Sequence, residues 1–215
     1  IFNEDTLAEL NRAVFTPIKF PDACKKVGIS LKQGILLSGG YGCGKTLTAS
    51  AVATLAPQYG WTVFICEDTR DLECTLKMAA RYPRSIVFAE DIDRLISGGS
   101  DYHRTPEMDR ILNTLDGVEL KSCDIMTIMT TNAVQEIHPG MMRPGRIDTL
   151  IPIVKPDPLS CQRLVQLYAG DLLSPDSNLE EAGEALASVG MIPASIKAIV
   201  EQAKLACVGR TGGEI

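Results

Sequence analysis

Short runs of apolar residues alternate with longer amphipathic segments over much of the chain. Four of these runs are predicted to be buried strands, because they are rich in branched and aromatic residues and too short for helices; they cover residues 34–38, 61–66, 85–90 and 124–131. Helical patterns lie between them, over residues 45–56, 70–82 and 106–117. Alternation of strand and helix implies right-handed crossovers between parallel strands. We therefore expect an α/β fold, a doubly wound parallel sheet covered by helices on both faces.

The pattern changes at IPIVKPDP, residues 151–158, where Pro residues interrupt the chain. Only helical patterns follow, around residues 158–169, 178–188 and 193–208. No internal repeat or low-complexity segment is visible. We predict a large α/β domain over residues 1–155 and a small helical domain over residues 156–215.

Composition is that of an ordinary globular protein that buries a core: the 215 residues are 45% hydrophobic and 22% charged. The net charge of −6 and the pI near 5.0 argue against a broad surface for nucleic acid. No stretch has the ~18 consecutive apolar residues of a membrane span, and no signal segment opens the chain. The sequence thus carries no clear nucleic-acid or membrane signal.

Cysteine usage favours an intracellular, reducing compartment. The seven cysteines contain no CxxC pair and form no metal-like cluster with the two histidines, His103 and His138. We therefore expect reduced thiols and a cytoplasmic location. The chain does not begin with Met, so we expect a domain of a longer protein, whose targeting these residues leave undetermined.

The strongest chemical motif is GGYGCGKT, residues 39–46, which follows a predicted strand and precedes a predicted helix. It matches the G-x-x-x-x-G-K-[ST] pattern of a phosphate-binding loop, or P-loop. Its backbone N–H groups and the helix N-terminus would bind phosphate oxygens, Lys45 would reach the β- and γ-phosphates, and the Thr46 hydroxyl would bind Mg2+. The predicted nucleotide-binding residues are Gly39, Gly40, Tyr41, Gly42, Cys43, Gly44, Lys45, Thr46 and Leu47.

Three side chains in or near this motif leave alternatives open. Cys43 either fills space or makes nucleotide binding sensitive to oxidation. Tyr41 and Trp61 are expected to be packing residues, and stacking on the nucleotide is a second option for Tyr41.

A pair of carboxylates, Glu90 and Asp91, ends the predicted strand in SIVFAEDIDR, residues 85–94. Nucleotide hydrolases often place Asp first and Glu second at such a strand end, so the order is reversed here. Position in the strand assigns the roles more than identity does, so Glu90 is expected to help hold Mg2+ through water and Asp91 to polarise the attacking water. The swap changes the length of both side chains by one methylene, which favours slower hydrolysis and does not by itself imply that hydrolysis is lost.

Several segments carry a family resemblance that covers essentially the whole chain. GISLKQGILLSGGYGCGKTLTASAVA, RILNTLDGV and IMTIMTTNAVQEIHPGMMRPGRID resemble three parts of an AAA ATPase module. The resemblance implies ATP and Mg2+ as ligands and a homo-oligomeric ring, a hexamer in this family, that acts on a macromolecular substrate. It also implies that Asn132 is the sensor 1 residue, which reads the γ-phosphate and orients water.

The RPGR segment is similar to the arginine pair that such modules insert into a neighbouring subunit's nucleotide site. The resemblance places Arg143 and Arg146 in this catalytic role. An arginine supplied in trans neutralises charge on the transferring phosphoryl group and makes hydrolysis depend on assembly. Pro144 and Gly145 are expected to form the stiff turn that projects both side chains.

The segment GMIPASIKAIVEQAKLA, residues 190–206, resembles the family's lid helix, which covers the nucleotide base. Gly190 and Ala194 match the family pattern and are expected to contribute to nucleotide binding. Ile192, Pro193 and Ser195 depart from the pattern. Lys197 is the nearest basic residue, and we expect it to face solvent.

Two further features depart from the pattern that the resemblance implies. The Glu-Asp order, together with MTTN and LDGV, is similar to the branch containing the mitochondrial translocase of the Rieske iron–sulphur protein, where an acidic swap also occurs. AAA unfoldases carry an aromatic-apolar-Gly pore loop between the second and third strands, and residues 67–84 contain none; Tyr82 is expected to pack at a helix end instead. Residues 97–107, with Tyr102 and His103, could form a different pore loop or an ordinary surface loop.

Three classes of function compete at this point. The first is an ATP-driven ring that remodels a macromolecule. The second is a nucleotide-gated scaffold or binding module in which Glu90 and Asp91 hydrolyse weakly or not at all. The third, a P-loop kinase or small GTPase, is disfavoured because the chain has no NKxD-like guanine-reading tetrapeptide and because it leaves the RPGR segment unexplained. We expect the first.

Overall fold

The computed structural model describes residues 2–95, 106–117, 120, 122–137 and 140–211. The chain forms two compact units. The sheet unit contains Ala8–Gly39 and Lys45–Pro152, and the helical unit contains Ile1–Leu7, Gly40–Gly44 and Ile153–Ile215. Each unit is made of segments that are not continuous in the sequence. The domain boundary at residue 155 stays a prediction.

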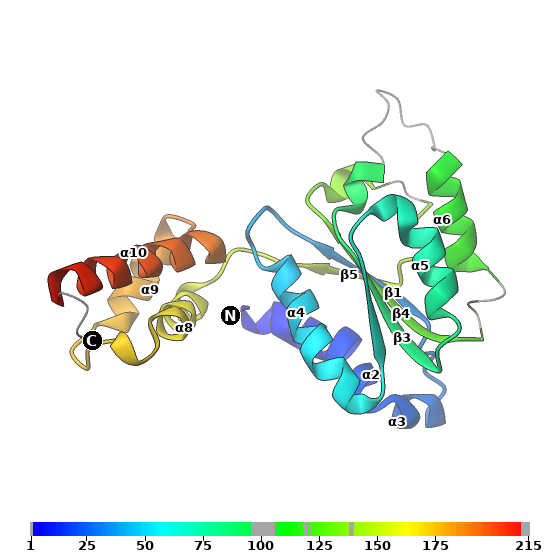
Figure 1. Cartoon of the computed structure of the whole chain (residues 1–215), viewed down its shortest axis with the longest axis horizontal. Coiled ribbons are helices and arrows are strands. Elements are labelled where there is room, and N and C mark those ends of the chain that lie inside the picture. The colour runs from blue at the N-terminus through cyan, green and yellow to red at the C-terminus, as the bar shows by residue number, and fades with distance from the viewer. Residues whose placement is uncertain (1, 96–105, 118–119, 121, 138–139, 212–215) are drawn as a thin grey trace. The chain divides into compact units, whose positions relative to one another are not determined.

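A five-stranded parallel sheet lies at the centre of the sheet unit (Figure 1). Its strands are β1 (Gln33–Ser38), β2 (Thr62–Cys66), β3 (Arg84–Ala89), β4 (Asp124–Thr131) and β5 (Thr149–Pro152). The spatial order is β2-β3-β4-β1-β5, and each neighbouring pair is parallel. The predicted α/β fold is confirmed, and β5 is a strand that the sequence pattern did not predict.

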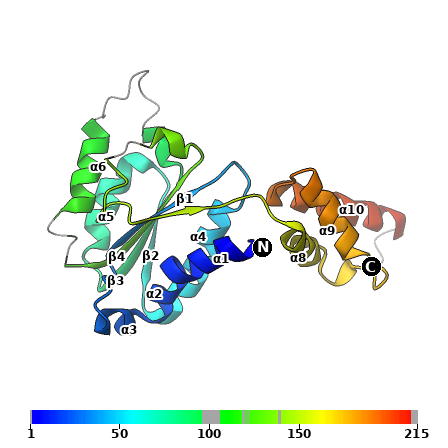
Figure 2. The same cartoon turned by 180° about the vertical axis from the view of Figure 1, so that it is seen from behind.

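Helices cover both faces of this sheet (Figures 1 and 2). Helices α5 (Leu72–Ala79) and α6 (Pro106–Asp116) lie on one face, and α2 (Thr16–Lys19) and α4 (Lys45–Leu55) lie on the other. The sequence also left unpredicted a helical N-terminal segment made of α1 (Glu4–Leu10), a π-helical turn (Asn11–Phe15), α2 and α3 (Pro21–Lys26). Short 3-10 turns occupy Ala56–Tyr59, Thr69–Asp71, Ile92–Leu95 and Val134–Glu136.

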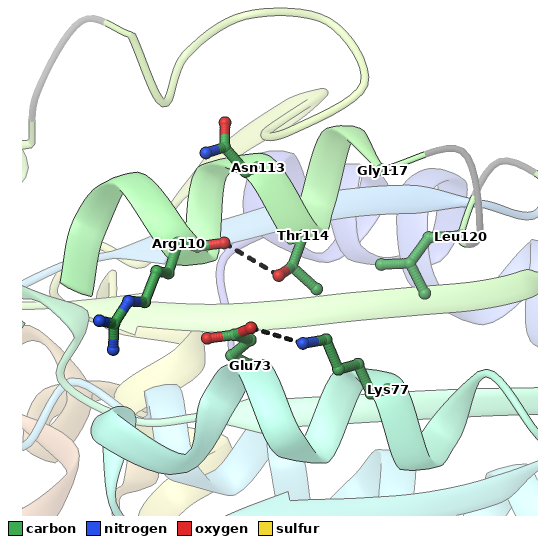
Figure 3. A pocket seen from close by; sticks show the side chains of 7 residues that line it. All are labelled: Glu73, Lys77, Arg110, Asn113, Thr114, Gly117 and Leu120. Atoms are coloured by element: carbon green, nitrogen blue, oxygen red, sulfur yellow. Dashed lines mark hydrogen bonds and ion pairs between the residues drawn. The ribbon is translucent and has the colours of Figure 1, made fainter. Parts of the chain in front are cut away.

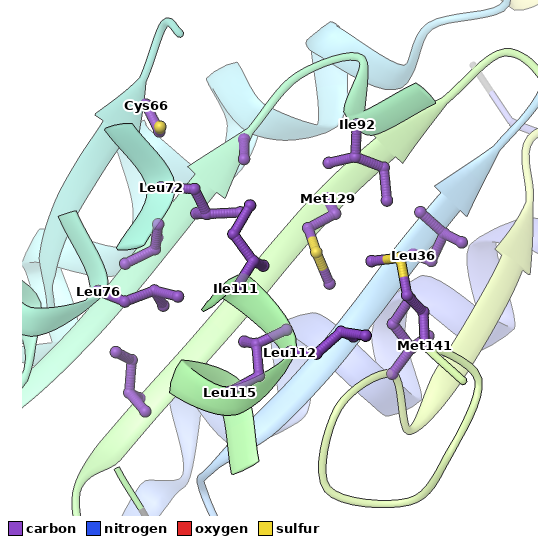
Figure 4. Packing of buried hydrophobic residues seen from close by; sticks show 14 of the residues in the cluster. Leu36, Cys66, Leu72, Leu76, Ile92, Ile111, Leu112, Leu115, Met129 and Met141 are labelled. Atoms are coloured by element: carbon purple, nitrogen blue, oxygen red, sulfur yellow. The ribbon is translucent and has the colours of Figure 1, made fainter. Parts of the chain in front are cut away.

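One hydrophobic core of the sheet unit lies between the sheet and helices α5 and α6 (Figure 4). Leu36 of β1 and Met129 of β4 are register partners on this face, and both are fully buried. The alternate residues, such as Ile35 and Ile128, are equally buried on the opposite face. Burial on both faces explains why these strands are continuous apolar runs in the sequence.

The helical unit contains α8 (Pro158–Ala169), α9 (Leu179–Ser188) and α10 (Pro193–Thr211), with a 3-10 turn at Gly170–Leu172. Side-chain oxygens cap two of these helices: Asp157 accepts from Ser160 N at 2.7 Å, and Asn178 accepts from Glu181 N at 3.2 Å. Lys197 faces solvent as predicted and pairs with Glu201 at 3.7 Å. Among the described residues, no helix is long and apolar enough to cross a membrane.

Two of the three aromatic packing predictions are confirmed. The Trp61 ring is buried and its Nε1 donates to the Ile18 carbonyl at 3.1 Å. Tyr82 lies just after the end of α5, and its ring packs edge-to-face against the Phe64 ring, with the ring centroids 5.1 Å apart. The prediction that Tyr41 packs is wrong, because this residue is 77% exposed.

Gly34 on β1 lies against the backbone of Arg146, and this yields a stability prediction. A Cβ added at Gly34 would lie 1.6 Å from the Arg146 carbonyl oxygen. We expect Gly34→Ala to lower the free energy of unfolding by at least about 2 kcal/mol. The atoms that the new methyl group would meet are all backbone atoms, so no flexible side chain can move aside to make room. Urea unfolding followed by circular dichroism measures this change.

The matched control is Gly209→Ala in α10, where an added Cβ meets nothing within 4 Å. Alanine favours a helix interior, so this variant should be more stable by about 0.5–1 kcal/mol. Equal unfolding midpoints for the two variants would contradict the close approach at Gly34.

Candidate nucleotide-binding site

The P-loop connects the carboxyl end of β1 to the first turn of α4. Gly42 and Gly44 take positive φ values of 72° and 109°, which glycine adopts without steric cost. The Lys45 side chain lies inward, with the residue only 8% exposed. Its Nζ donates to the Gly39 carbonyl and to Asn132 Oδ1, each at 2.7 Å. Cys43 is 4% exposed, which fits the packing alternative for this thiol.

The two carboxylates of the reversed pair contact different partners. Thr46 Oγ1 donates to Glu90 Oε1 at 2.6 Å. Asn132 Nδ2 donates to Asp91 Oδ1 at 2.9 Å, and the Asn132 backbone N donates to Asp93 Oδ1 at 3.2 Å. The ends of β1, β3 and β4 are therefore linked by hydrogen bonds at one edge of the sheet, and Lys45, Thr46, Glu90, Asp91 and Asn132 lie together there.

This arrangement provides hard oxygen donors for a Mg2+ ion. The Thr46 hydroxyl and the Glu90 carboxylate are adjacent, and Mg2+ in nucleotide sites commonly takes one or two protein oxygens together with phosphates and water. No group of three or more acidic, His or Cys side chains that could hold a metal by itself occurs in the part of the chain that the structure describes. The residues thus fit a metal ion held jointly with a nucleotide.

The Asp91 backbone is in a left-handed conformation, with φ of 50°, and it is the only non-glycine residue with positive φ among those described. Its N–H donates to Thr130 Oγ1 at 2.9 Å, which helps to hold this turn. Asp and Asn tolerate the left-handed region better than other side chains do, because their short polar groups make local hydrogen bonds. Strained backbone of this kind is concentrated at functional sites.

Within the helical unit, which includes Gly40–Gly44, the middle of the P-loop contacts residues that are distant in the sequence. The Ala194 N–H donates to the Gly42 carbonyl at 3.4 Å. A Cβ added at Gly42 would lie 2.7 Å from Ile192 Cδ1, and one at Gly44 would lie 3.2 Å from Phe2 Cε1. No sequence pattern indicated Phe2, and Ile192 was noted only as a departure from the family pattern. Gly190, whose φ is 65°, lies at the turn before α10, where an added Cβ would stand 3.0 Å from Lys155 Nζ.

Arg143 and Arg146 lie apart from these residues, next to the amino end of β1. Asp148, which follows the RPGR turn, donates its N–H to the Gly34 carbonyl at 2.7 Å. The two arginine side chains differ: Arg143 is exposed, whereas the Arg146 side chain is 13% exposed. Arg146 Nε donates to Asp116 Oδ2 at 2.5 Å, and its Nη1 donates to the Gly140 carbonyl at 2.7 Å.

A separate hollow of about 450 Å3 lies between α5 and α6 (Figure 3). Lys77 Nζ donates to Glu73 Oε1 at 2.6 Å along its α5 side, and this hydrogen bond lowers the pKa of the Glu73 carboxyl. The hollow is lined by Glu73, Lys77, Arg110, Asn113, Thr114, Gly117 and Leu120. None of these is a predicted nucleotide-binding residue. This hollow is therefore distinct from the P-loop site.

A P-loop after the first strand, with acidic and polar side chains at the ends of the next strands of a parallel sheet, defines the class of P-loop nucleotide-binding proteins. Within this class, residues 35–154 match the model of the ATPase family associated with various cellular activities, AAA. The match covers more than half of the 215 residues, and the chain belongs to this family.

Curated relatives agree with this family. The chain is 30% identical over 217 residues to the 26S proteasome regulatory subunit 4 homolog of Schizosaccharomyces pombe, covering 94% of this chain and 48% of the relative. It is 31% identical over 217 residues to the proteasome-activating nucleotidase of Methanocaldococcus jannaschii, covering 93% and 49%. The protein of that name from Thermococcus gammatolerans is 35% identical over 170 residues, covering 72% and 42%. The chain thus spans about half the length of the curated relatives it matches.

The left-handed backbone at Asp91 predicts an unusual ranking of substitutions. Asp91→Gly and Asp91→Val both remove the carboxylate that accepts from Asn132, but only valine adds a β-branched side chain at positive φ. We expect Asp91→Val to be less stable than Asp91→Gly by about 1–3 kcal/mol. Chemical unfolding of the two variants measures the difference.

Asp91→Asn is the control, because Asn adopts the same backbone conformation. It should stay within about 0.5 kcal/mol of the original protein, the usual range for a tolerated substitution. If valine and glycine at this position are equally stable, the left-handed conformation of Asp91 is not a constraint.

Proposed function

We propose that the chain binds ATP with Mg2+ and hydrolyses it at the P-loop edge of the sheet. The observation that carries this proposal is the hydrogen-bonded series from Lys45 through Asn132 to Asp91. It joins a phosphate-binding cation to a carboxylate through one amide, and phosphoryl transfer depends on such positioned groups that bind the phosphates and orient the water. Membership of a family of ATPases supports the same activity.

The two acids have different partners and therefore different proposed roles. Glu90 accepts a hydrogen bond from the Thr46 hydroxyl, so we assign this pair to the metal ion. Asp91 lies on the Asn132 amide, so we assign it to orienting the attacking water. Bound Mg2+ would neutralise charge on the phosphates, and Lys45 would bind the phosphate oxygens. The remaining P-loop residues would bind the nucleotide, and Gly190 and Ala194 stay predicted nucleotide-binding residues.

Arg143 acts, in this proposal, on the nucleotide of a neighbouring copy. Gly34, beside the RPGR turn, and Gly39, in the P-loop, stand at opposite ends of β1, about 16 Å apart over five residue steps. An arginine at the amino end of the strand is thus poorly placed to serve its own P-loop. Arg146, held by Asp116, stays within its own subunit and supports the turn.

We propose a ring of identical subunits, six by family resemblance, in which each site is completed by the next subunit's Arg143. Two relatives are named as a proteasome regulatory subunit and a proteasome-activating nucleotidase. A macromolecular partner that the ring remodels is consistent with these names. We also propose an intracellular location, because Cys24, Cys43, Cys66, Cys74 and Cys161 form no disulfide.

The route by which such a partner is engaged differs from aromatic threading between β2 and α5. That connection is only Glu67–Asp71, and Asp68 caps its 3-10 turn by accepting from Arg70 N at 2.9 Å. It contains acidic and basic side chains and no aromatic ring. The alternative loop with Tyr102 and His103 lies outside the described residues.

A nucleotide-gated scaffold is the second candidate. The reversed order of Glu90 and Asp91 favours it, since a misplacement of about 1 Å at a reacting group costs roughly 100-fold in rate. Binding and turnover measured separately distinguish the two functions.

We expect ATP turnover per subunit to rise with protein concentration, because the site needs a neighbour's arginine. Asp91→Asn should bind ATP with unchanged affinity and lose turnover by at least about 100-fold, because the amide cannot accept a proton from water. Steady-state phosphate release and equilibrium nucleotide binding measure these two quantities. Tight ATP binding without turnover by an assembled wild-type protein would support the scaffold instead.

Removing the exposed arginine should affect turnover and leave ATP affinity intact. We expect Arg143→Ala to lower kcat by about 10^3-fold or more, the usual contribution of an arginine finger. The control is Arg81→Ala, an exposed arginine after α5, which should leave kcat within about twofold, as substitutions away from a site usually do. Equal rates for the two variants would remove Arg143 from the mechanism.

A further inference from the structure

The carboxylate of Asp148 binds two backbone groups that belong to different elements. Its Oδ1 accepts from the Gly145 N–H at 2.7 Å, within the RPGR turn. Its Oδ2 accepts from the Gly34 N–H at 2.8 Å, at the start of β1. The Asp148 N–H returns a hydrogen bond to the Gly34 carbonyl at 2.7 Å. One side chain therefore ties the turn that carries Arg143 to the strand that leads into the P-loop.

Two neighbours fix the same turn from other directions. Lys32 Nζ donates to the Gly145 carbonyl at 2.7 Å, so both backbone groups of Gly145 are bound. The Arg146 carbonyl lies over Gly34, where an added Cβ would stand only 1.6 Å from its oxygen. The turn is thus attached to β1 by a carboxylate and close backbone packing and to Lys32, the residue before β1, by an ammonium group, all within the sheet unit.

Arg143 itself has no such attachment. It is exposed, and no ion pair or hydrogen bond of its side chain to another described residue is found, in contrast to Arg146. The direction in which Arg143 projects is therefore set by the backbone of the turn. A residue acting on a neighbour's nucleotide must be placed to within a fraction of an ångström, since a misplacement of about 1 Å costs roughly 100-fold in rate.

We propose that Asp148 is a positioning residue, which holds the RPGR turn on β1 so that Arg143 reaches the neighbouring subunit's nucleotide. The proposal rests on the proposed function, in which Arg143 acts in trans. Both carboxylate oxygens are required, because each accepts from a different N–H group. An asparagine offers one acceptor oxygen and places an N–H₂ group against the other donor.

The first test is turnover. We expect Asp148→Ala and Asp148→Asn to keep ATP affinity within about twofold and to lower kcat by roughly 100-fold. The control is Asp124→Ala at the start of β4, on the same edge of the sheet, where the carboxylate pairs with Lys25 and lies 3.9 Å from Arg84 Nε. Asp124 does not touch the turn, so its removal should leave kcat within about threefold. Equal kcat values for the Asp148 and Asp124 variants would overturn the proposal.

The second test separates positioning from general damage by mixing variants. An Asp148→Ala subunit keeps Lys45 and Asp91 but supplies a misplaced arginine, whereas an Asp91→Asn subunit supplies a correct arginine to its neighbour. An equimolar mixture should therefore hydrolyse ATP at least about tenfold faster than either variant alone. Adding Arg143→Ala to the Asp91→Asn partner should abolish this gain. A mixture no faster than its components would show that Asp148 acts on its own subunit's site or on folding.

The third test does not depend on hydrolysis. Amide hydrogen exchange of Gly145 and Gly34 should become roughly tenfold faster in Asp148→Ala, as expected when a hydrogen bond to a charged acceptor is lost. Unchanged exchange at both amides would overturn the positioning role even if the wild-type protein proves to be a scaffold. If exchange becomes faster in an assembled protein that has no ATP turnover, Asp148 still holds the RPGR turn on β1, and the proposed ATPase function is rejected.

Discussion

The buried ammonium group of Lys45 constrains the rest of the site. A buried charge must be paired or hydrogen-bonded, and Lys45 finds the Gly39 carbonyl on its own loop and the Asn132 amide at the end of β4. The second contact requires β4 to lie beside β1 in the observed register, with Ser38 opposite Thr131. Because Asn132 in turn donates to Asp91, the strand order of the sheet and the polarity of the site depend on each other.

The fold was largely predictable because burial on both faces makes each central strand a continuous apolar run. β4 was predicted with the bounds that the structure gives, and the apolar residues of β3 are buried on alternating sides. β5 could not be found in this way. It has four residues, lies at the edge of the sheet and is partly exposed, as Leu150 shows at 38%, so its pattern does not differ from that of a loop. The N-terminal helices were missed although they carry cap signals: Asn3 accepts from the Thr6 N–H at 3.0 Å before α1, and Gly28, with φ of 81°, follows α3.

In the candidate site, too, residues in local motifs could be predicted from the sequence, whereas contacts between residues far apart in the sequence could not. The P-loop and the Glu90–Asp91 pair are local motifs at strand ends, so sequence patterns located them. Asn132 needed the family resemblance, because an Asn at a strand end is commonly a turn residue. The ion pair between Arg146 and Asp116 joins residues 30 positions apart, and no sequence pattern indicates it. Two arginines that look equivalent in the sequence therefore differ in the structure, one exposed and one tied to its own subunit.

The order of the two acids has a physical explanation in the backbone. β3 ends at Ala89, and the chain turns at Asp91 through a left-handed conformation that short polar side chains tolerate and that glutamate does not favour. A Glu at position 91 would be held in a left-handed backbone conformation that its longer side chain disfavours. A Glu at position 90 spans the gap to Thr46, which it reaches at 2.6 Å. The reversed pair thus matches the geometry of this turn, and restoring the common order without changing the turn would place both carboxylates worse.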